Sequence, residues 1–196
     1  MKAIGDVETK RKFTAVANGA ITSGDPVVIE SAGTVAKPSG SSGPDTSGSA
    51  VAFATGGDWM QIGYDSDSDK FIVAYRDGNN SSYGTAVVGN VSNVTISYGT
   101  PVVFETANTL YFSVAYDENA QKVVIAYEDI DNGQRGTAVV GTVSGTSISF
   151  GTPVVFNDQA VQFNAVVYDP SSQKVVIFYK DDGTAGDPGR AIVGTV

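Results

Sequence analysis

Six aspartates recur at a spacing of 52 residues, and their carboxylates are the groups best suited to chemistry in this sequence. They form two sets of three: Asp65, Asp117 and Asp169, and Asp77, Asp129 and Asp181. Repeated carboxylates can act as acids or bases, or they can bind sugars. Because every repeat carries both aspartates, we favour a structural role, in which each aspartate caps a turn by accepting hydrogen bonds.

The stretch Asp65-Ser66-Asp67-Ser68-Asp69 has the alternating aspartates that open a calcium-binding loop. The equivalent stretches at 117–121 and 169–173 keep only the first aspartate. No glycine and no bidentate glutamate follow at the spacing that such a loop needs. We therefore expect a polar turn at each place, with no metal and no other cofactor.

The sequence contains neither histidine nor cysteine. It therefore has no imidazole acid or base, no thiolate nucleophile and no zinc site built on those residues. The Gly-x-Ser-x-Gly nucleophile pattern and the glycine-rich phosphate loop are also absent. These absences predict a protein that is not an enzyme. Trp59 could belong to a ligand surface together with the polar loops at 78–83, 130–135 and 183–189, or it could pack in the core.

The net charge of −9 is distributed unevenly. Residues 1–42 hold 5 basic and 4 acidic side chains, whereas the rest of the chain holds 7 and 17. Phosphates would be repelled by this acidic body, so we expect no nucleic-acid partner. No apolar run reaches the roughly 20 residues of a membrane span, and no signal peptide follows Met1. We expect synthesis in a cytoplasm and no membrane insertion.

The aspartates belong to a 52-residue repeat, which is the strongest signal in the sequence. Each copy contains one related phrase, at Lys70–Asp77, Lys122–Asp129 and Lys174–Asp181. No stretch has the 3.6-residue period of a helix. Each copy therefore reads as four strands, which in the second copy are 110–116, 122–127, 137–143 and 147–156, the last with a Gly-Thr-Pro kink. The β-branched run at 122–127 predicts a strand buried on both faces.

About 50 residues in four antiparallel strands is the size of a β-propeller blade, and such sheets must stack to bury their faces. The predicted fold is all-β, with three parts: an N-terminal β anchoring module at 1–37, a Gly/Ser/Pro linker at 38–49, and three four-stranded propeller-like repeats at 50–196. The body opens with a final-strand segment at 50–54 and ends without one. A longer chain, a three-sheet prism or copies that complete a ring all remain open, and we expect a homo-oligomer.

The repeats resemble those of large structural proteins of bacteriophages, notably marine and cyanobacterial ones. The resemblance covers about 50–196 and rests on the phrase at Lys122–Asp129 and the one that follows at 136–156. Residues 20–35 are similar to small β modules at the start of virion fibre or decoration proteins. The resemblance implies a virion component, either a capsid decoration or head-fibre protein or a tail fibre. Residues 1–42 would bind other virion proteins, and the repeats would be displayed outward for host-surface adhesion or shell stabilisation.

Two other functions remain open on the sequence alone. The first is a glycan-binding β-propeller lectin that is not part of a virion. The second is an enzyme on a propeller, such as a glycosidase or lyase that uses paired carboxylates. A host-surface glycan is a candidate partner both for the virion protein and for the lectin.

Overall fold

A computed structural model describes residues 48–196 and, before them, residues 17, 20, 28–29 and 34–36. The chain divides into two compact units, 1–46 and 47–196. In the first unit, β1 (Val28–Ile29) pairs with β2 (Val35–Ala36) in antiparallel register. The predicted anchoring module at 1–37 and linker at 38–49 fall almost entirely on residues outside the described part of the chain.

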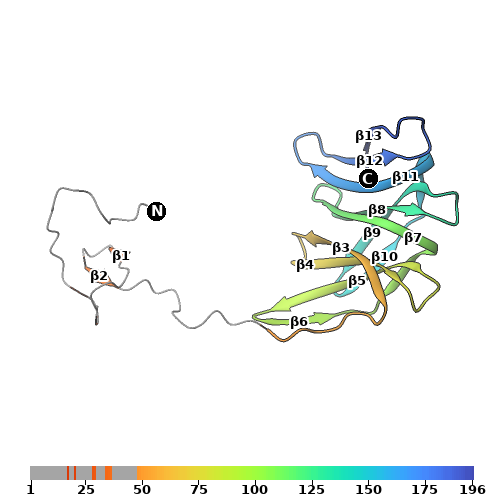
Figure 1. The fold of residues 1–196 in the computed structure, drawn as a ribbon. Coiled ribbons are helices and arrows are strands. Elements are labelled where there is room, and N and C mark those ends of the chain that lie inside the picture. Colours follow the sequence, from red (N-terminus) through yellow and green to blue (C-terminus); the bar gives the residue numbers. More distant parts are fainter. Residues whose placement is uncertain (1–16, 18–19, 21–27, 30–33, 37–47) are drawn as a thin grey trace, which may run out of the picture. The chain divides into compact units, whose positions relative to one another are not determined.

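The second unit is an open antiparallel sheet of eleven strands (Figure 1). The all-β prediction is confirmed, because no helix occurs among the described residues. That part of the chain accordingly holds no helix long and apolar enough to cross a membrane. The strands are β3 (Gly57–Asp65), β4 (Lys70–Asp77), β5 (Tyr83–Ser92), β6 (Thr95–Tyr98), β7 (Val102–Asp117), β8 (Lys122–Asp129), β9 (Arg135–Ser144), β10 (Ser147–Phe150), β11 (Val154–Asp169), β12 (Lys174–Asp181) and β13 (Gly189–Gly194).

The strand order is β13-β12-β11-β9-β8-β7-β5-β4-β3, with β6 beside β5 and β10 beside β9. The edges β3 and β13 do not pair with each other, so the described residues form no closed propeller within one chain. The Gly-Thr-Pro kink is present between β10 and β11. The prediction that the fourth strand ends at 156 is wrong, because β11 continues from Val154 to Asp169 without a break.

The two long strands, β7 and β11, each serve two neighbours. The first residues of β7 pair with β5, as in Val103 with Thr85, and its later residues pair with β8, as in Ser113 with Ala126. Register shifts separate these two parts, and β11 repeats the arrangement between β9 and β12. The sheet therefore divides into three layers: layer 1 (57–105), layer 2 (109–157) and layer 3 (161–194).

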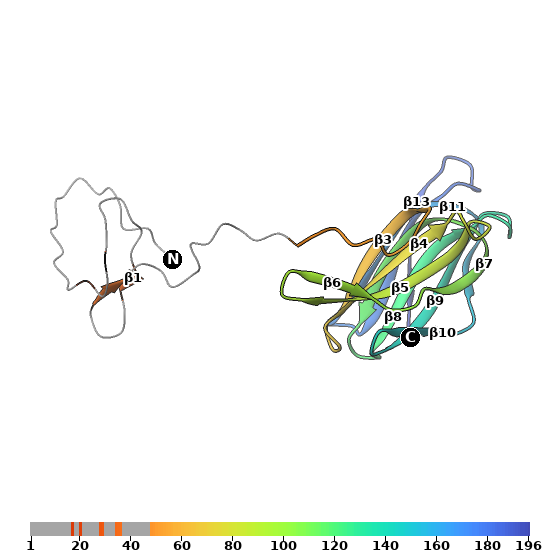
Figure 2. The ribbon, with the colours of Figure 1, turned by 90° about the horizontal axis from the view of Figure 1, so that it is seen from below.

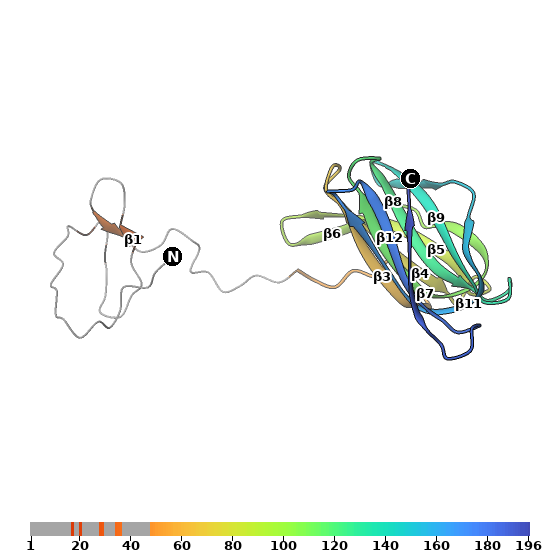
Figure 3. The same cartoon turned by 90° about the horizontal axis from the view of Figure 1, so that it is seen from above.

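The three layers pack against one another in chain order. Figure 2 shows their strands running with a common tilt, and Figure 3 shows β12 in front of β8 and β9. One hydrophobic cluster joins layers 1 and 2, and it includes Ile72, Ala74, Val123, Ile125 and Tyr127. A second cluster joins layers 2 and 3. The core therefore lies between the layers.

Strand β8 in the middle layer is buried on both faces, as its β-branched run predicts. Val123 and Ile125 face layer 1, and Val124 and Ala126 face layer 3. We call the side of a layer that faces the preceding layer its front face, and the opposite side its back face. Burying each of the larger side chains contributes roughly 1.5–3 kcal/mol. Layer 2 is the only layer of the described chain with a neighbour on both faces.

Candidate functional site

The first set of repeated aspartates lies in the tight turn between the first two strands of each layer. Asp117 accepts hydrogen bonds from the backbone N–H groups of Asn119 (3.0 Å) and Ala120 (2.9 Å). Asp65 and Asp169 accept equivalent bonds in layers 1 and 3. These side chains satisfy turn donors that would otherwise lack a partner within the protein.

The second set lies at the other end of the second strand, where the next loop begins. Asp129 accepts a hydrogen bond from the backbone N–H of Asn132 (3.2 Å), and Asp77 accepts one from its own loop. Asp181 accepts from the hydroxyl of Thr184 (2.8 Å) and from Nε of Arg190 (2.6 Å). A whole strand separates the two sets, so the fold does not bring them together as a carboxylate pair.

Trp59 is exposed, at 47% of its surface, and the interpretation as a core residue is wrong. Its ring meets the ring of Tyr111 with centroids 5.1 Å apart and planes at 75°. Tyr111 in turn lies 5.0 Å from Phe163, at 54°. The three residues are spaced by 52, and they stand at equivalent positions on neighbouring layers. We call Trp59, Tyr111 and Phe163 the aromatic column.

A β-bulge presents each ring of the column. In layer 1, Asp58 pairs with Arg76 and Gln61 with Ala74, which leaves one residue too many on β3. Equivalent register shifts flank Tyr111 and Phe163. All three aromatic residues have a left-handed backbone, with φ of +50°, +50° and +53°. Because this conformation costs an L residue about 1–2 kcal/mol, its threefold recurrence indicates that the bulge aims the ring.

The column borders a hollow of about 310 Å³, at the small end of the roughly 300–1,000 Å³ typical of ligand sites. Its lining comes from the bulges of all three layers: Trp59, Met60, Gln61, Tyr111, Phe112, Phe163 and Asn164. None of these side chains is charged at neutral pH. The hollow therefore suits a neutral ligand, and its walls offer no carboxylate for acid or base catalysis.

Two amides supply the polar part of this hollow. Asn164 donates from Nδ2 to the backbone carbonyl of Tyr111 at 3.1 Å, which ties layer 3 to layer 2 beside the column. Gln61 is exposed, and its amide can both donate and accept hydrogen bonds. The arrangement combines flat apolar rings with a hydrogen-bonding side chain at the rim.

The strongest perturbation of a carboxyl pKa lies outside this hollow, at Glu128. The side chain is 1% exposed, and burial raises its pKa from 4.5 to about 7, with a further increase from the charge of Asp182. The equivalent residues of the other layers are Arg76 and Lys180, which form ion pairs. A carboxyl with a pKa near 7 suits acid–base catalysis, but Glu128 does not line the hollow beside the aromatic column.

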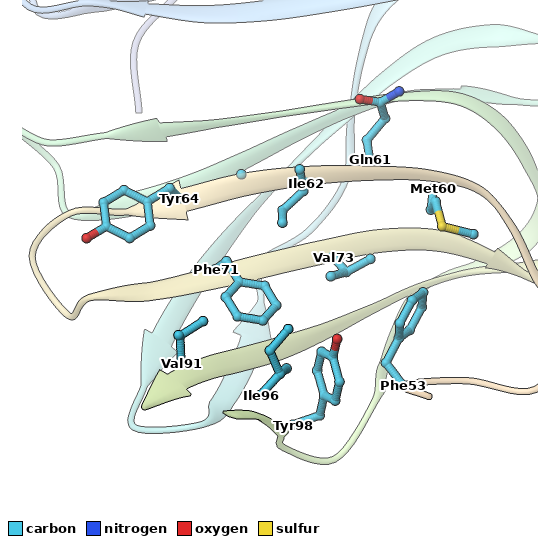
Figure 4. Close-up of a pocket in the computed structure, with 11 residues that line it drawn as sticks. Phe53, Met60, Gln61, Ile62, Tyr64, Phe71, Val73, Val91, Ile96 and Tyr98 are labelled. Carbon is cyan, nitrogen blue, oxygen red and sulfur yellow. The ribbon is translucent and has the colours of Figure 1, made fainter. Parts of the chain in front are cut away.

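A larger hollow of about 670 Å³ lies on the front face of layer 1 (Figure 4). It is lined mainly by apolar side chains of β3, β4 and the β5–β6 hairpin: Phe53, Met60, Gln61, Ile62, Gly63, Tyr64, Phe71, Val73, Val91, Ile96 and Tyr98. No preceding layer covers this face among the described residues. The hollow therefore lies on a face of the kind that, in layers 2 and 3, packs against the preceding layer.

Sequence reasoning found Trp59 but missed Tyr111 and Phe163. A signal was present, because an aromatic residue recurs at the 52-residue spacing in all three copies. In the described part of the chain, no group of three or more acidic side chains is arranged to hold a metal ion. Comparison of the sequence with protein-family models and with curated proteins found no match.

Proposed function

We propose that this chain is a non-enzymatic adhesive protein of a bacteriophage particle, in which the aromatic column binds a neutral glycan of the host surface. The observation that carries the proposal is the column itself: three partly exposed rings in edge-to-face or tilted contact, each held by a bulge at one position of three repeats. The rings contact one another between layers, but Trp59 and Phe163 leave 47% and 65% of their surface exposed, which packing between layers does not require.

The column has the chemistry that sugars require. A pyranose ring presents a flat face of C–H groups, which stacks on an aromatic ring, and hydroxyl groups at its edge. Trp59, Tyr111 and Phe163 would each support such a face, and the amide of Gln61 would bond to hydroxyls. Because adjacent rings lie at 75° and 54° to each other, they form no single flat platform, and each exposed ring would stack on a sugar separately.

A neutral glycan is favoured over a nucleic acid, whose bases also stack on aromatic rings. Stacking of bases brings the phosphates close to the protein, and the body from residue 43 onward holds 17 acidic and only 7 basic side chains. Binding of single strands depends on a positively charged groove, which an acidic body opposes. Neutral sugars carry no such cost.

The virion assignment is supported by the resemblance of the repeats to bacteriophage structural proteins. In this proposal residues 1–42 bind capsid or tail proteins, and the three layers are propeller-like blades displayed outward. The alternative is a lectin with the same column but no place in a particle. Incorporation of the intact chain into particles separates the two. Deleting residues 1–45 then tests the anchoring role: we expect incorporation to be lost, and retained incorporation contradicts that role.

The glycan part of the proposal is tested with the full-length chain on an array of neutral and acidic glycans. We expect binding to neutral glycans that Trp59→Ala abolishes or reduces at least about fivefold, because stacking of a nucleic-acid base on an aromatic ring contributes about 1–3 kcal/mol and a sugar ring offers a face of similar size. Val154→Ala is the control, since it removes an exposed apolar side chain that lines neither hollow. Equal loss in both variants, or no binding at all, contradicts the proposal.

A further inference from the structure

The front face of layer 1 exposes positions that are covered in the other layers. Ile62 is 63% exposed, whereas its equivalent Val114 packs in the cluster between layers 1 and 2. Met60 is 49% exposed, whereas its equivalent Phe112 is 3% exposed. In Figure 4, Met60, Ile62 and Phe71 point into the same hollow. On its β3 side, layer 1 therefore exposes the surface that layers 2 and 3 bury against a preceding layer. Elsewhere on this face, Phe53 and Ala54 pack against the buried Val73, Tyr75 and Val87.

The back face of layer 3 likewise exposes apolar side chains at positions that are buried in layers 1 and 2. Phe178 is 50% exposed, whereas its equivalents Ala74 and Ala126 are fully buried against the following layer. Val193 and Val167 are also exposed on this face. These three side chains lie together, because β12 pairs with β11 on one side and with β13 on the other. The patch is apolar, and patches of this kind mark interaction sites.

These two faces are the halves of an interface that the chain already forms twice. Layer 1 packs its back face on the front of layer 2, and layer 2 packs its back face on the front of layer 3. The back faces of layers 1 and 2 are flattened by small residues: a Cβ at Gly63 would lie 2.5 Å from Cγ1 of Val114. Layer 3 carries the larger Val167 and Phe178 instead, and the front of layer 1 holds the hollow of about 670 Å³. Extra bulk on one open face thus matches extra space on the other.

A hydrogen bond at the edge of the interface between layers also lacks its counterpart at the open front face of layer 1. Between layers 1 and 2, the hydroxyl of Tyr116 donates to Asp67 in the turn of the preceding layer at 2.7 Å. Its equivalent Tyr64 has no preceding layer among the described residues, and its hydroxyl donates to Asp69 of its own turn, also at 2.7 Å. The tyrosine hydroxyl of layer 1 thus bonds within its own layer, whereas that of layer 2 bonds to the preceding layer.

We propose that two copies of the chain close head to tail, with the back face of layer 3 of each copy seated on the front face of layer 1 of the other. The occupant is a second copy because the matching surface exists on the same chain and repeats contacts already present inside it. Interfaces of this unlike-to-unlike kind form rings when the rotation closes. Two chains of three layers give six, which lies within the roughly four to eight blades of propellers. This inference does not depend on glycan binding.

The test uses the full-length chain and two variants, Ile62→Lys on the front face and Phe178→Glu on the back face. Native mass measurement should give twice 20.2 kDa for the unaltered chain and 20.2 kDa for each variant alone. Mixing the two variants should restore the dimer, because the mixed pair keeps one unaltered interface and places the introduced lysine opposite the introduced glutamate at the other. Val94→Lys, an exposed apolar position in the β5–β6 turn, should remain dimeric.

Several outcomes would overturn the inference. An unaltered chain that remains monomeric at micromolar concentration contradicts it, and so does an open series of larger assemblies. Dissociation by only one of the two variants indicates pairing of like faces, front to front or back to back. Failure of the mixture to re-form a dimer also contradicts it, provided that both variants keep the cooperative unfolding of the unaltered chain.

Discussion

Trp59 and Tyr111 are 52 residues apart in the sequence, yet their rings meet edge to face with centroids 5.1 Å apart. Each ring stands on a bulge of a different layer, and each has a left-handed backbone. The contact therefore depends both on the packing of layer 1 on layer 2 and on two strained residues. Because the layers stack, the aromatic residue at one position of each repeat contacts the aromatic residue of the next repeat.

The strain at the column predicts an unusual order of stability for substitutions of Phe163. Its ring is 65% exposed, so removal of the ring loses little burial, while φ of +53° disfavours any residue with a Cβ. Phe163→Gly should therefore be more stable than Phe163→Ala by about 1 kcal/mol. Urea unfolding of the two variants measures the difference. An alanine variant as stable as the glycine variant would show that the backbone at this bulge is not strained.

The buried carboxyl of Glu128 predicts a loss of stability as the pH rises. Its pKa is about 7 in the folded chain and 4.5 in the unfolded chain, so between these values the folded state binds more protons. Stability from this group is complete below pH 4.5 and falls until about pH 7, by at most ~3 kcal/mol. Glu128→Gln should be more stable than the unaltered chain at pH 8, with the advantage gone at pH 4.

The control for this experiment is Glu118→Gln, which alters an exposed carboxylate of the same layer. The substitution should change the free energy of unfolding little, because an exposed charge contributes little to stability. Chemical denaturation at several pH values gives both comparisons. The account of Glu128 is wrong if its glutamine variant shows no greater pH dependence of the difference than the Glu118 variant.

The turn aspartates predict graded losses of stability that follow their burial. Asp117 is 2% exposed and accepts two backbone hydrogen bonds, so Asp117→Ala should lower the free energy of unfolding by about 1–3 kcal/mol. Asp169 occupies the same turn in layer 3 but is more exposed, so Asp169→Ala should cost less. Thermal unfolding of the pair checks the order. The reverse order would mean that the turn of layer 3 matters more to the fold than its burial indicates.

The sequence predicted the strand content, the turns and the burial of β8, because repetition and β-branched runs report these features directly. It did not predict that β7 and β11 each pass through two layers, since the change of partner at 106–108 and 158–160 depends on tertiary packing. Trp59 was recognised by its type. Tyr111 and Phe163 were missed because the repeat keeps their aromatic character and not their identity, and because a bulge breaks the alternation that marks a face.

The burial of Glu128 left no trace in the sequence for a different reason. The same position holds Arg76 in layer 1 and Lys180 in layer 3, each with an acidic partner. Because all three repeats carry a charged residue at this position, the sequence predicts that the position is exposed to solvent. Only the packing of layer 3 on layer 2 shows that the carboxyl of the middle layer is enclosed.

The central claim is that the aromatic column binds a neutral glycan, and the fluorescence of Trp59 tests it most directly. Trp59 is the only tryptophan, so the intrinsic emission reports on the column itself. Titration of the full-length chain with neutral oligosaccharides should give a saturable change in emission. The variant with both Tyr111→Ala and Phe163→Ala keeps Trp59 and should show at least a tenfold weaker response. Emission that stays constant across the panel, or an unchanged response in that variant, would contradict the claim.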